Sequence, residues 1–184
     1  MKVLKFGGTS VANAESIRKV GGIISRESDR IVVVVSALGG ITDQILKAAG
    51  SAVHATGSVE AEVAAIRKRH TELIHELLGE NREVLQSVGN ILTELEQVLT
   101  GIALVNETTP KTQDRILGMG ERMSSVIISA FLGVKLVDTA GLIVTDSSFG
   151  KALVDYEETF TRITKALGNE SQTVLVPGFI AKNK

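Results

Sequence analysis

The sequence predicts an α/β protein with a mainly parallel sheet flanked by helices. Short apolar runs rich in β-branched residues alternate with longer segments whose apolar positions recur every three or four residues. The 18 glycines against two prolines fit tight turns between strands and helices. Because this alternation forms parallel sheets covered by helices on both faces, we expect one such core in a chain of 184 residues that is 43% hydrophobic.

The first two strand–turn–helix units show the pattern most plainly. Residues 3–6 and 31–35 are apolar runs typical of strands buried on both faces, and a glycine pair follows each of them. After the first pair, apolar positions at helical spacing extend over residues 11–24. After the second pair, Thr42 or Asp43 marks the start of another helix.

The middle of the chain predicts three long helices. Residues 58–79 and 81–104 are consecutive amphipathic segments, which predicts a helical hairpin inserted into the α/β pattern. A third helix over residues 112–132 contains Gly118 and Gly120, each of which costs a helix about 1 kcal/mol relative to alanine. We therefore expect a close backbone approach at these two glycines.

The last part of the chain returns to the alternating pattern. Residues 134–137, 142–144 and 173–176 predict strands, and residues 157–167 predict a helix. No repeat or linker-like composition interrupts the chain, so no internal domain boundary is expected within residues 1–184.

The composition leaves small neutral or zwitterionic ligands open. The 20 Lys and Arg residues nearly cancel the 21 Asp and Glu residues, and aromatics reach only 3%, so we expect no nucleic-acid partner and no membrane contact. The absence of cysteine excludes disulfides and thiolate chemistry. Charged residues interrupt the first apolar run, so we expect neither a signal peptide nor a membrane anchor, and a cytoplasmic location.

The histidines and the densest basic run predict solvated helix surface. His70 and His75 are off the three-or-four spacing that places two metal ligands on one helix face, and His54 is expected in a polar loop. Residues 67–69, with the sequence RKR, predict a wet helix face. We therefore expect no metal site.

Ligands of open parallel sheets bind at the carboxyl ends of the strands, so the residues found there are the candidates for chemistry. Residues 5–11 read KFGGTSV: Lys5 supplies a cation, and the glycines expose backbone N–H groups at a helix start. This arrangement suits phosphate oxygens. It is not a Walker loop, because the lysine precedes the glycines. On the glycine pair alone, a tight structural turn is the alternative.

Several short segments carry a family resemblance. They are KFGGTSV at 5–11, VSA at 35–37 with GIT at 40–42, GERMSS at 120–125, FGKA at 149–152 and VPGFI at 176–180. In this order, and over nearly the whole chain, they resemble the kinase domain of aspartate kinases, which has the amino-acid-kinase fold. The helical segment between Gly57 and Thr109 and the DTAG sequence at 138–141 look closest to bifunctional aspartokinase–homoserine dehydrogenases.

The resemblance implies phosphoryl transfer from ATP, with Mg²⁺, to the β-carboxylate of L-aspartate, the first step towards lysine, threonine and methionine. A carboxylate of pKa about 4 is ionised at neutral pH, so this nucleophile needs no general base. By the same resemblance, Lys5 would stabilise the charge of the transferring group. The implied phosphate-binding residues are Gly7, Gly8, Thr9 and Ser10.

For the substrate, the resemblance implies that Glu121 binds the ammonium of aspartate and that Ser36 and Thr42 donate to its oxygens. Each residue also has an ordinary structural interpretation. Glu121 would then be an exposed carboxylate paired with Arg115 or Arg122, the Ser36 hydroxyl would cap the turn after its strand, and Thr42 would cap a helix.

The family pattern also contains parts that this sequence lacks. Aspartate kinases continue with a glycine-rich Ser-Asp segment that supplies an arginine to the substrate and most contacts to the nucleotide. We therefore expect residues 1–184 to be the substrate-side half of a kinase domain, inactive alone. An incomplete sheet exposes apolar surface, so a homo-oligomer is expected. Phe179 either borders the substrate or, like most phenylalanines, packs in the core.

Two other classes of function stay open on the sequence. One is another kinase of the same fold, acting on glutamate, acetylglutamate or a nucleotide, although the KFGGTS and Gly120-Glu121 sequences count against it. The other is a non-catalytic binding or assembly module that uses the helical hairpin as a protein contact.

Overall fold

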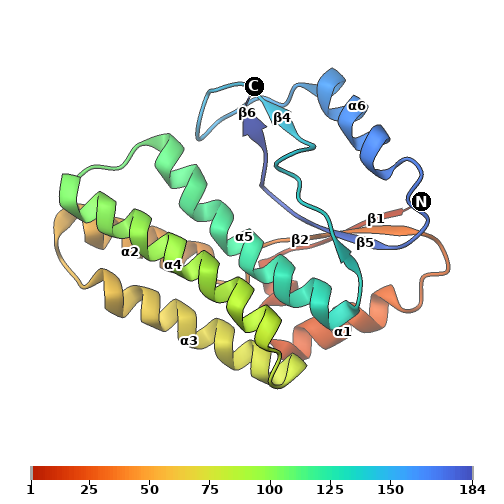
Figure 1. The fold of residues 1–184 in the computed structure, drawn as a ribbon, viewed down its shortest axis with the longest axis horizontal. Helices are drawn as coiled ribbons and strands as arrows, with labels where there is room; N and C mark the ends of the chain where they lie inside the picture. The colour runs from red at the N-terminus through yellow and green to blue at the C-terminus, as the bar shows by residue number, and fades with distance from the viewer. Residues whose placement is uncertain (1, 184) are drawn as a thin grey trace.

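The computed structural model describes residues 2–183 and contains a four-stranded parallel sheet with helices on both faces (Figure 1). Across this sheet the strands follow the order β1 (Lys2–Phe6), β2 (Ile31–Val35), β5 (Val174–Pro177) and β3 (Lys135–Leu136). A separate parallel pair is formed by β4 (Val144–Thr145) and β6 (Lys182–Asn183). The predicted fold class is confirmed.

The helices lie where the apolar periodicity predicts them. They are the short 3-10 helix η1 (Gly8–Val11), α1 (Ala14–Ile24), α2 (Ile41–His54), α3 (Val59–Leu78), α4 (Arg82–Val105), α5 (Pro110–Leu132) and α6 (Tyr156–Leu167). The start of α1 differs from expectation, because η1 comes first. Asn13 then caps α1, and its side chain accepts a hydrogen bond from the Ser16 N–H at 2.9 Å.

The two faces of the sheet pack against different helices. Strand β2 shows the alternation: Ile31, Val33 and Val35 belong to the main core, whereas Val32 packs in a second cluster with Leu167 of α6. Figure 1 shows α6 on one side of the sheet and α1 and α5 on the other. A strand covered on both sides explains the unbroken apolar sequence of β2.

The helices α2 to α5 form a layered group beside the sheet, in which α4 contacts α2, α3 and α5 (Figure 1). Within the described residues, α4 is the one helix long and apolar enough to cross a membrane, with a mean hydropathy of 1.2. A core helix meets the same criteria, and the apolar face of α4 is buried in the main core. Its buried residues are Val84, Val88, Ile91, Leu92, Leu95, Leu99 and Ile102.

Gly120 allows α5 to approach the end of β2 and the start of α2. A Cβ atom at Gly120 would lie 3.1 Å from the Ala37 Cβ and 3.3 Å from the Ile41 Cγ2. The expected close approach is therefore present at Gly120, and the protein's own chain makes it. At Gly118 the nearest atom would be a side-chain carbon of Ile180 at 3.8 Å, an ordinary contact, so the described residues make no close approach there.

His70 is fully buried in α3, and the prediction of a solvated position was wrong. Its Nδ1 lies 2.8 Å from the Ile66 carbonyl oxygen, which accepts a hydrogen bond from it, and within residues 2–183 its Nε2 has no hydrogen-bond partner. Burial lowers the pKa of His70 to about 4. By contrast His75 is exposed, and the exposed His54 ends α2 rather than lying in a loop.

We predict that His70 makes the folded state sensitive to mild acid. Its pKa is about 4 in the folded chain, against 6.5 for an unperturbed histidine, so the unfolded chain binds more protons between these pH values. Its contribution to stability is complete above about pH 6.5 and falls by roughly 3 kcal/mol as the pH approaches 4. Urea unfolding at several pH values gives the free energy of unfolding at each pH. Between about pH 4 and 6.5, this free energy should change less with pH for His70→Gln than for the wild type. An unchanged dependence of the unfolding free energy on pH in His70→Gln would contradict the assignment.

Candidate functional site

The candidate site lies at the carboxyl end of the sheet, where the loops after β1 and β2 touch each other. The parallel register pairs Phe6 with Val35, so both loops leave the sheet at the same level. A Cβ atom at Gly39 would lie 3.0 Å from the Gly8 carbonyl oxygen, and one at Gly8 would lie 3.1 Å from the Ala37 carbonyl oxygen. Only bare backbones fit at this distance.

This contact brings together backbone donors that the fold leaves unused. Within residues 2–183, the N–H groups of Gly7, Gly8, Gly39 and Gly40 have no acceptor. The Ser10 N–H, by contrast, donates to the Gly7 carbonyl oxygen at 2.9 Å, which closes the turn. Unpaired N–H groups from two adjacent loops favour an anion, because their dipoles are fixed in place. The site is therefore chemically suited to phosphate.

Lys5 adds a positive charge at the same edge. The side chain is exposed on β1, and it forms no ion pair with any of the described residues. Its charge is nevertheless close enough to lower the pKa of Glu121 on α5. The structure thus brings together Lys5 and Glu121, which lie far apart in the sequence.

Glu121 is a nearly buried carboxylate with an unsatisfied oxygen. The residue is 9% exposed, and its Oε2 has no hydrogen-bond partner within residues 2–183. A Cβ atom at Gly178 would lie 3.3 Å from this Oε2, so the turn after β5 packs directly on the carboxylate. Burial raises the pKa of Glu121, against the opposing effects of the Ala37 N–H, the Lys5 charge and the Gly178 N–H.

The alternative interpretation of Glu121 as an exposed carboxylate paired with an arginine was wrong. Arg115 and Arg122 both bind Glu94 on α4, each at 3.0 Å. Burial raises the pKa of Glu94, but the two guanidinium groups outweigh it and hold that pKa below its usual value. Glu121 is left for another cation.

Ser36 and Thr42 both follow β2 but are held differently. The Ser36 N–H donates to the Phe6 carbonyl oxygen at 3.1 Å, and its carbonyl oxygen accepts from the Ser124 Oγ at 2.7 Å. These bonds fix the backbone and leave the Ser36 hydroxyl without a partner in the described chain. Thr42 is exposed in the first turn of α2. Its interpretation as a cap was wrong, since Gly40 with φ of 81° is the N-cap.

Two side chains near the site differ from their predicted roles. Phe179 is 65% exposed, with φ of 57°, at the turn that packs on Glu121, so its interpretation as a core residue was wrong. Arg69 was expected on a wet helix face, but its Nη2 donates to the carbonyl oxygens of Gly39 at 2.5 Å and Ala12 at 3.3 Å. Its two basic neighbours do face outward, where they pair with glutamates of α3 and α4.

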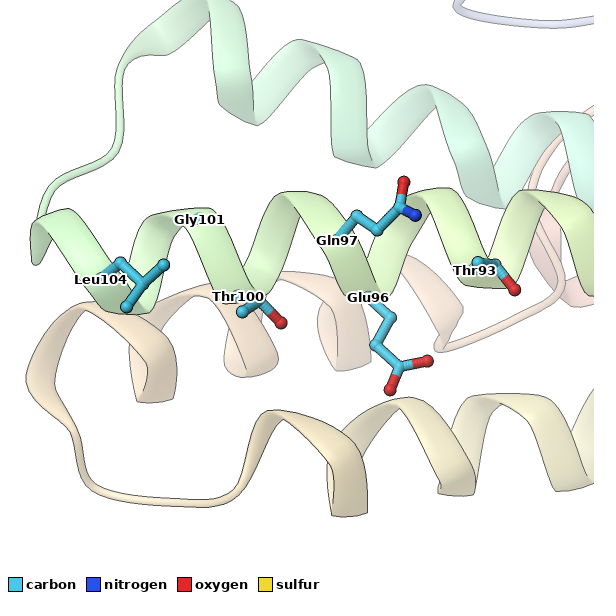
Figure 2. Close-up of a pocket in the computed structure, with 6 residues that line it drawn as sticks. All are labelled: Thr93, Glu96, Gln97, Thr100, Gly101 and Leu104. Atoms are coloured by element: carbon cyan, nitrogen blue, oxygen red, sulfur yellow. The ribbon is translucent and has the colours of Figure 1, made fainter.

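Two hollows of the surface lie away from the predicted site residues. A groove of about 410 Å³ on α4 is lined by Thr93, Glu96, Gln97, Thr100, Gly101 and Leu104, as Figure 2 shows. A second hollow of about 430 Å³ beside β3 contains Arg122 and Glu94, which already pair with each other. Neither contains a predicted site residue. The described residues also hold no group of three metal-ligating side chains, so no Mg²⁺ site is assigned to them.

Comparison with protein families identifies the class of this chain. Residues 1–184 match the amino acid kinase family over the whole chain. The chain therefore belongs to the amino acid kinase family.

Its individual relatives are aspartokinases. The chain is 33% identical to aspartokinase 2, chloroplastic, of Arabidopsis thaliana over 98% of its length, and it spans 35% of that relative. It is 32% identical to an aspartokinase of Chlamydia trachomatis, of which it spans 39%. A bifunctional aspartokinase/homoserine dehydrogenase of Buchnera aphidicola is 29% identical, and the chain spans 24% of it. The predicted resemblance to aspartate kinases is confirmed, and both types of relative occur among the matches.

Solved structures agree on the fold. E. coli aspartokinase III in complex with lysine and aspartate matches with a TM-score of 0.88 at 24% identity, over 100% of this chain and 42% of that one. Clostridium acetobutylicum aspartate kinase matches with a TM-score of 0.74 at 25% identity, over 99% of this chain and 40% of that one.

We predict that the contact between the two loops tolerates no side chain at Gly39. In Gly39→Ala the new methyl group meets the Gly8 carbonyl oxygen, a backbone atom that yields only if the loop moves. Such overpacking should lower the free energy of unfolding by about 1–3 kcal/mol in urea titrations. Gly7→Ala is the matched control, because no atom lies within 4 Å of its would-be Cβ. Equal stability of the two variants would show that the loops move apart freely.

Proposed function

We propose that this chain is the substrate-side part of an aspartate kinase, which transfers the γ-phosphate of ATP to the β-carboxylate of L-aspartate and gives 4-phospho-L-aspartate. The observation that carries the proposal is the unpaired Oε2 of the buried Glu121, next to Lys5 and to two loops with unused N–H donors. An amino acid that accepts a phosphoryl group offers its ammonium to Glu121 and brings phosphate oxygens to Lys5 and the two loops. The aspartokinase relatives support the same substrate.

In the proposed reaction, a β-carboxylate oxygen forms a bond to the γ-phosphorus while the bond from that phosphorus to the β,γ-bridging oxygen breaks, and ADP leaves. The carboxylate is already ionised, so the protein need not remove a proton. Catalysis then consists of alignment and of stabilising charge on the transferring group. Lys5 is the side chain proposed to stabilise that charge.

The glycine-rich loops are proposed to hold the phosphate oxygens. The N–H groups of Gly7 and Gly8 come from the first loop, and the Thr9 and Ser10 hydroxyls are exposed just beyond them. Donors that are fixed before the ligand arrives lose little entropy on binding. This preorganisation follows from the contact of Gly8 with Gly39.

Glu121 is proposed to bind the substrate ammonium. A buried carboxylate oxygen without a donor is costly, and a bound ammonium would supply both the hydrogen bond and the compensating charge. Protonation of Glu121 would remove the charge that binds the substrate ammonium. Because burial raises the pKa of Glu121, this loss of aspartate binding should begin at a higher pH than it would with an ordinary glutamate. Ser36 and Thr42 are proposed as donors to the substrate oxygens.

The remaining contacts of such a reaction are proposed to come from outside these residues. The chain spans 35% of the length of the Arabidopsis aspartokinase and 24% of the bifunctional Buchnera relative. A solved relative, E. coli aspartokinase III, is in complex with aspartate and ADP, and this chain covers 42% of it. We propose that residues 1–184 form one unit without an internal boundary, which supplies the substrate contacts and part of the phosphate contacts, and that MgATP needs further residues.

In the complete enzyme that contains this chain, we predict opposite kinetic signatures for the two charged residues. Lys5→Ala should lower kcat by roughly 10²–10³-fold, since the ammonium acts mainly on charge that develops during transfer. Glu121→Ala should chiefly raise the KM for aspartate, by roughly 10–100-fold, because a charge-assisted hydrogen bond is lost. Steady-state kinetics with a panel of aspartate, glutamate and acetylglutamate gives both values. Exchanged signatures would overturn the two roles, and a preference for another acceptor would overturn the substrate.

We also predict that the 184-residue chain alone does not turn over ATP and aspartate. It offers Lys5 near the substrate carboxylate, whereas most of the proposed nucleotide contacts lie outside these residues. A coupled assay of ADP release, run beside the same chain with Lys5→Ala, is the measurement. Turnover above that control would show that the nucleotide site lies within these residues.

A further inference from the structure

Arg69 reaches from the helical hairpin to both loops of the proposed site. It lies on α3, and one nitrogen of its guanidinium group, Nη2, donates to the Gly39 and Ala12 carbonyl oxygens at 2.5 Å and 3.3 Å. Gly39 belongs to the loop after β2, and Ala12 ends the loop after β1. One side chain therefore connects three segments that are distant in the sequence.

The two carbonyl groups are neighbours because their loops already touch. A Cβ atom at Gly39 would lie 3.0 Å from the Cβ of Ala12 as well as 3.0 Å from the Gly8 carbonyl oxygen. The other guanidinium nitrogen, Nη1, would be 3.7 Å from a Cβ atom at Gly40. The guanidinium thus covers the back of the loop contact.

This position fixes the direction of an unused donor. In a trans peptide the C=O and N–H groups point to opposite sides of the chain, so a guanidinium that holds the Gly39 carbonyl oxygen turns the Gly40 N–H away from itself. That N–H has no acceptor within residues 2–183, and Gly40 has φ of 81°, a conformation that only glycine adopts readily. Without Arg69, the Gly39–Gly40 peptide would lose the bond that orients it.

The side chain is anchored at its own end. The next residue of α3, His70, is fully buried in the core, so the backbone that carries Arg69 has a fixed place. Arg67, two positions earlier, has no such role, because it lies 3.8 Å from Glu96 at the surface. Arg67 and Arg69 therefore form a matched pair on one helix, one facing outward and one bound to the loops.

We propose that Arg69 is a positioning residue for phosphoryl transfer, which orients the Gly40 N–H donor through the Gly39 carbonyl group and ties this loop to the first one through the Ala12 carbonyl group. The guanidinium group acts through the backbone and touches neither reactant. This inference rests on the proposed function for its kinetic consequence, whereas its structural part can be tested without any turnover.

The experiment uses the complete enzyme that contains this chain, with Arg69→Met, Arg69→Lys and the control Arg67→Met. Amide hydrogen exchange is followed at the Ser10 and Ile41 N–H groups, which donate within the two loops to the Gly7 and Leu38 carbonyl oxygens, and in α4. We expect exchange at the two loops to become about tenfold faster in Arg69→Met, with α4 unchanged. The exchange rate of Arg69→Lys at the two loops should lie between those of the wild type and Arg69→Met, because lysine keeps the charge but not the planar group. Arg67→Met should match the wild type.

The kinetic arm separates positioning from folding. Arg69→Met should lower kcat by ~10–100-fold with little change in the KM for aspartate, as expected for misaligned phosphate donors. For Arg69→Ala, added methylguanidinium should restore part of kcat, which a general loss of structure would not allow.

Wild-type exchange at both loops in Arg69→Met would overturn the proposal, and so would equally faster exchange in α4. If the enzyme shows no aspartate-dependent release of ADP, the proposed function fails and the exchange arm alone decides on Arg69.

Discussion

The contact of two bare backbones, Gly8 against the segment from Ala37 to Gly39, is the constraint on which the rest of the site depends. Neighbouring parallel strands end at the same level, so the loops that follow must either diverge or pack at backbone distance. Here they pack, and the peptide groups are held with several N–H donors unpaired. Gly120 likewise allows a close approach because it has no side chain, and it lets α5 pack directly against Ala37. Small residues thus bring the backbone close to the site from several directions.

Glu121 is held in place by this close packing. Its helix is tied to the end of β2 by the bond from Ser124 to the Ser36 carbonyl oxygen and by the contact at Gly120. The carboxylate stays 9% exposed in this packing, and its Oε2 has no hydrogen-bond donor among the described residues. A polar group left unsatisfied in this way lowers stability. Such a cost is typical of a binding site, where the missing partner is the ligand.

Local patterns in the sequence predicted most of the secondary structure and the position of the two glycine loops. Strand and helix periodicity is a short-range signal, and the carboxyl ends of β1 and β2 follow from it. The places of His70, Arg69 and Phe179 were not predicted. The contact of Arg69 with Ala12 joins residues 57 positions apart, and no spacing rule reaches that far. His70 had a readable signal, because it continues the apolar stripe of Val63 and Ile66 on α3.

The two charged residues of the site, Lys5 and Glu121, differ in burial because the faces of the sheet are covered unequally. The second cluster around α6 covers β2 and β5, while Val3 on β1 remains 62% exposed. Lys5 lies two positions along the same strand and shares that uncovered face. An ammonium in water interacts weakly, because the solvent screens its field, whereas the same charge under a protein cover acts several times more strongly. Glu121 is already in such an environment and Lys5 is not. A bound nucleotide or further protein that covers β1 would therefore strengthen the effect of the Lys5 charge on the transferring group.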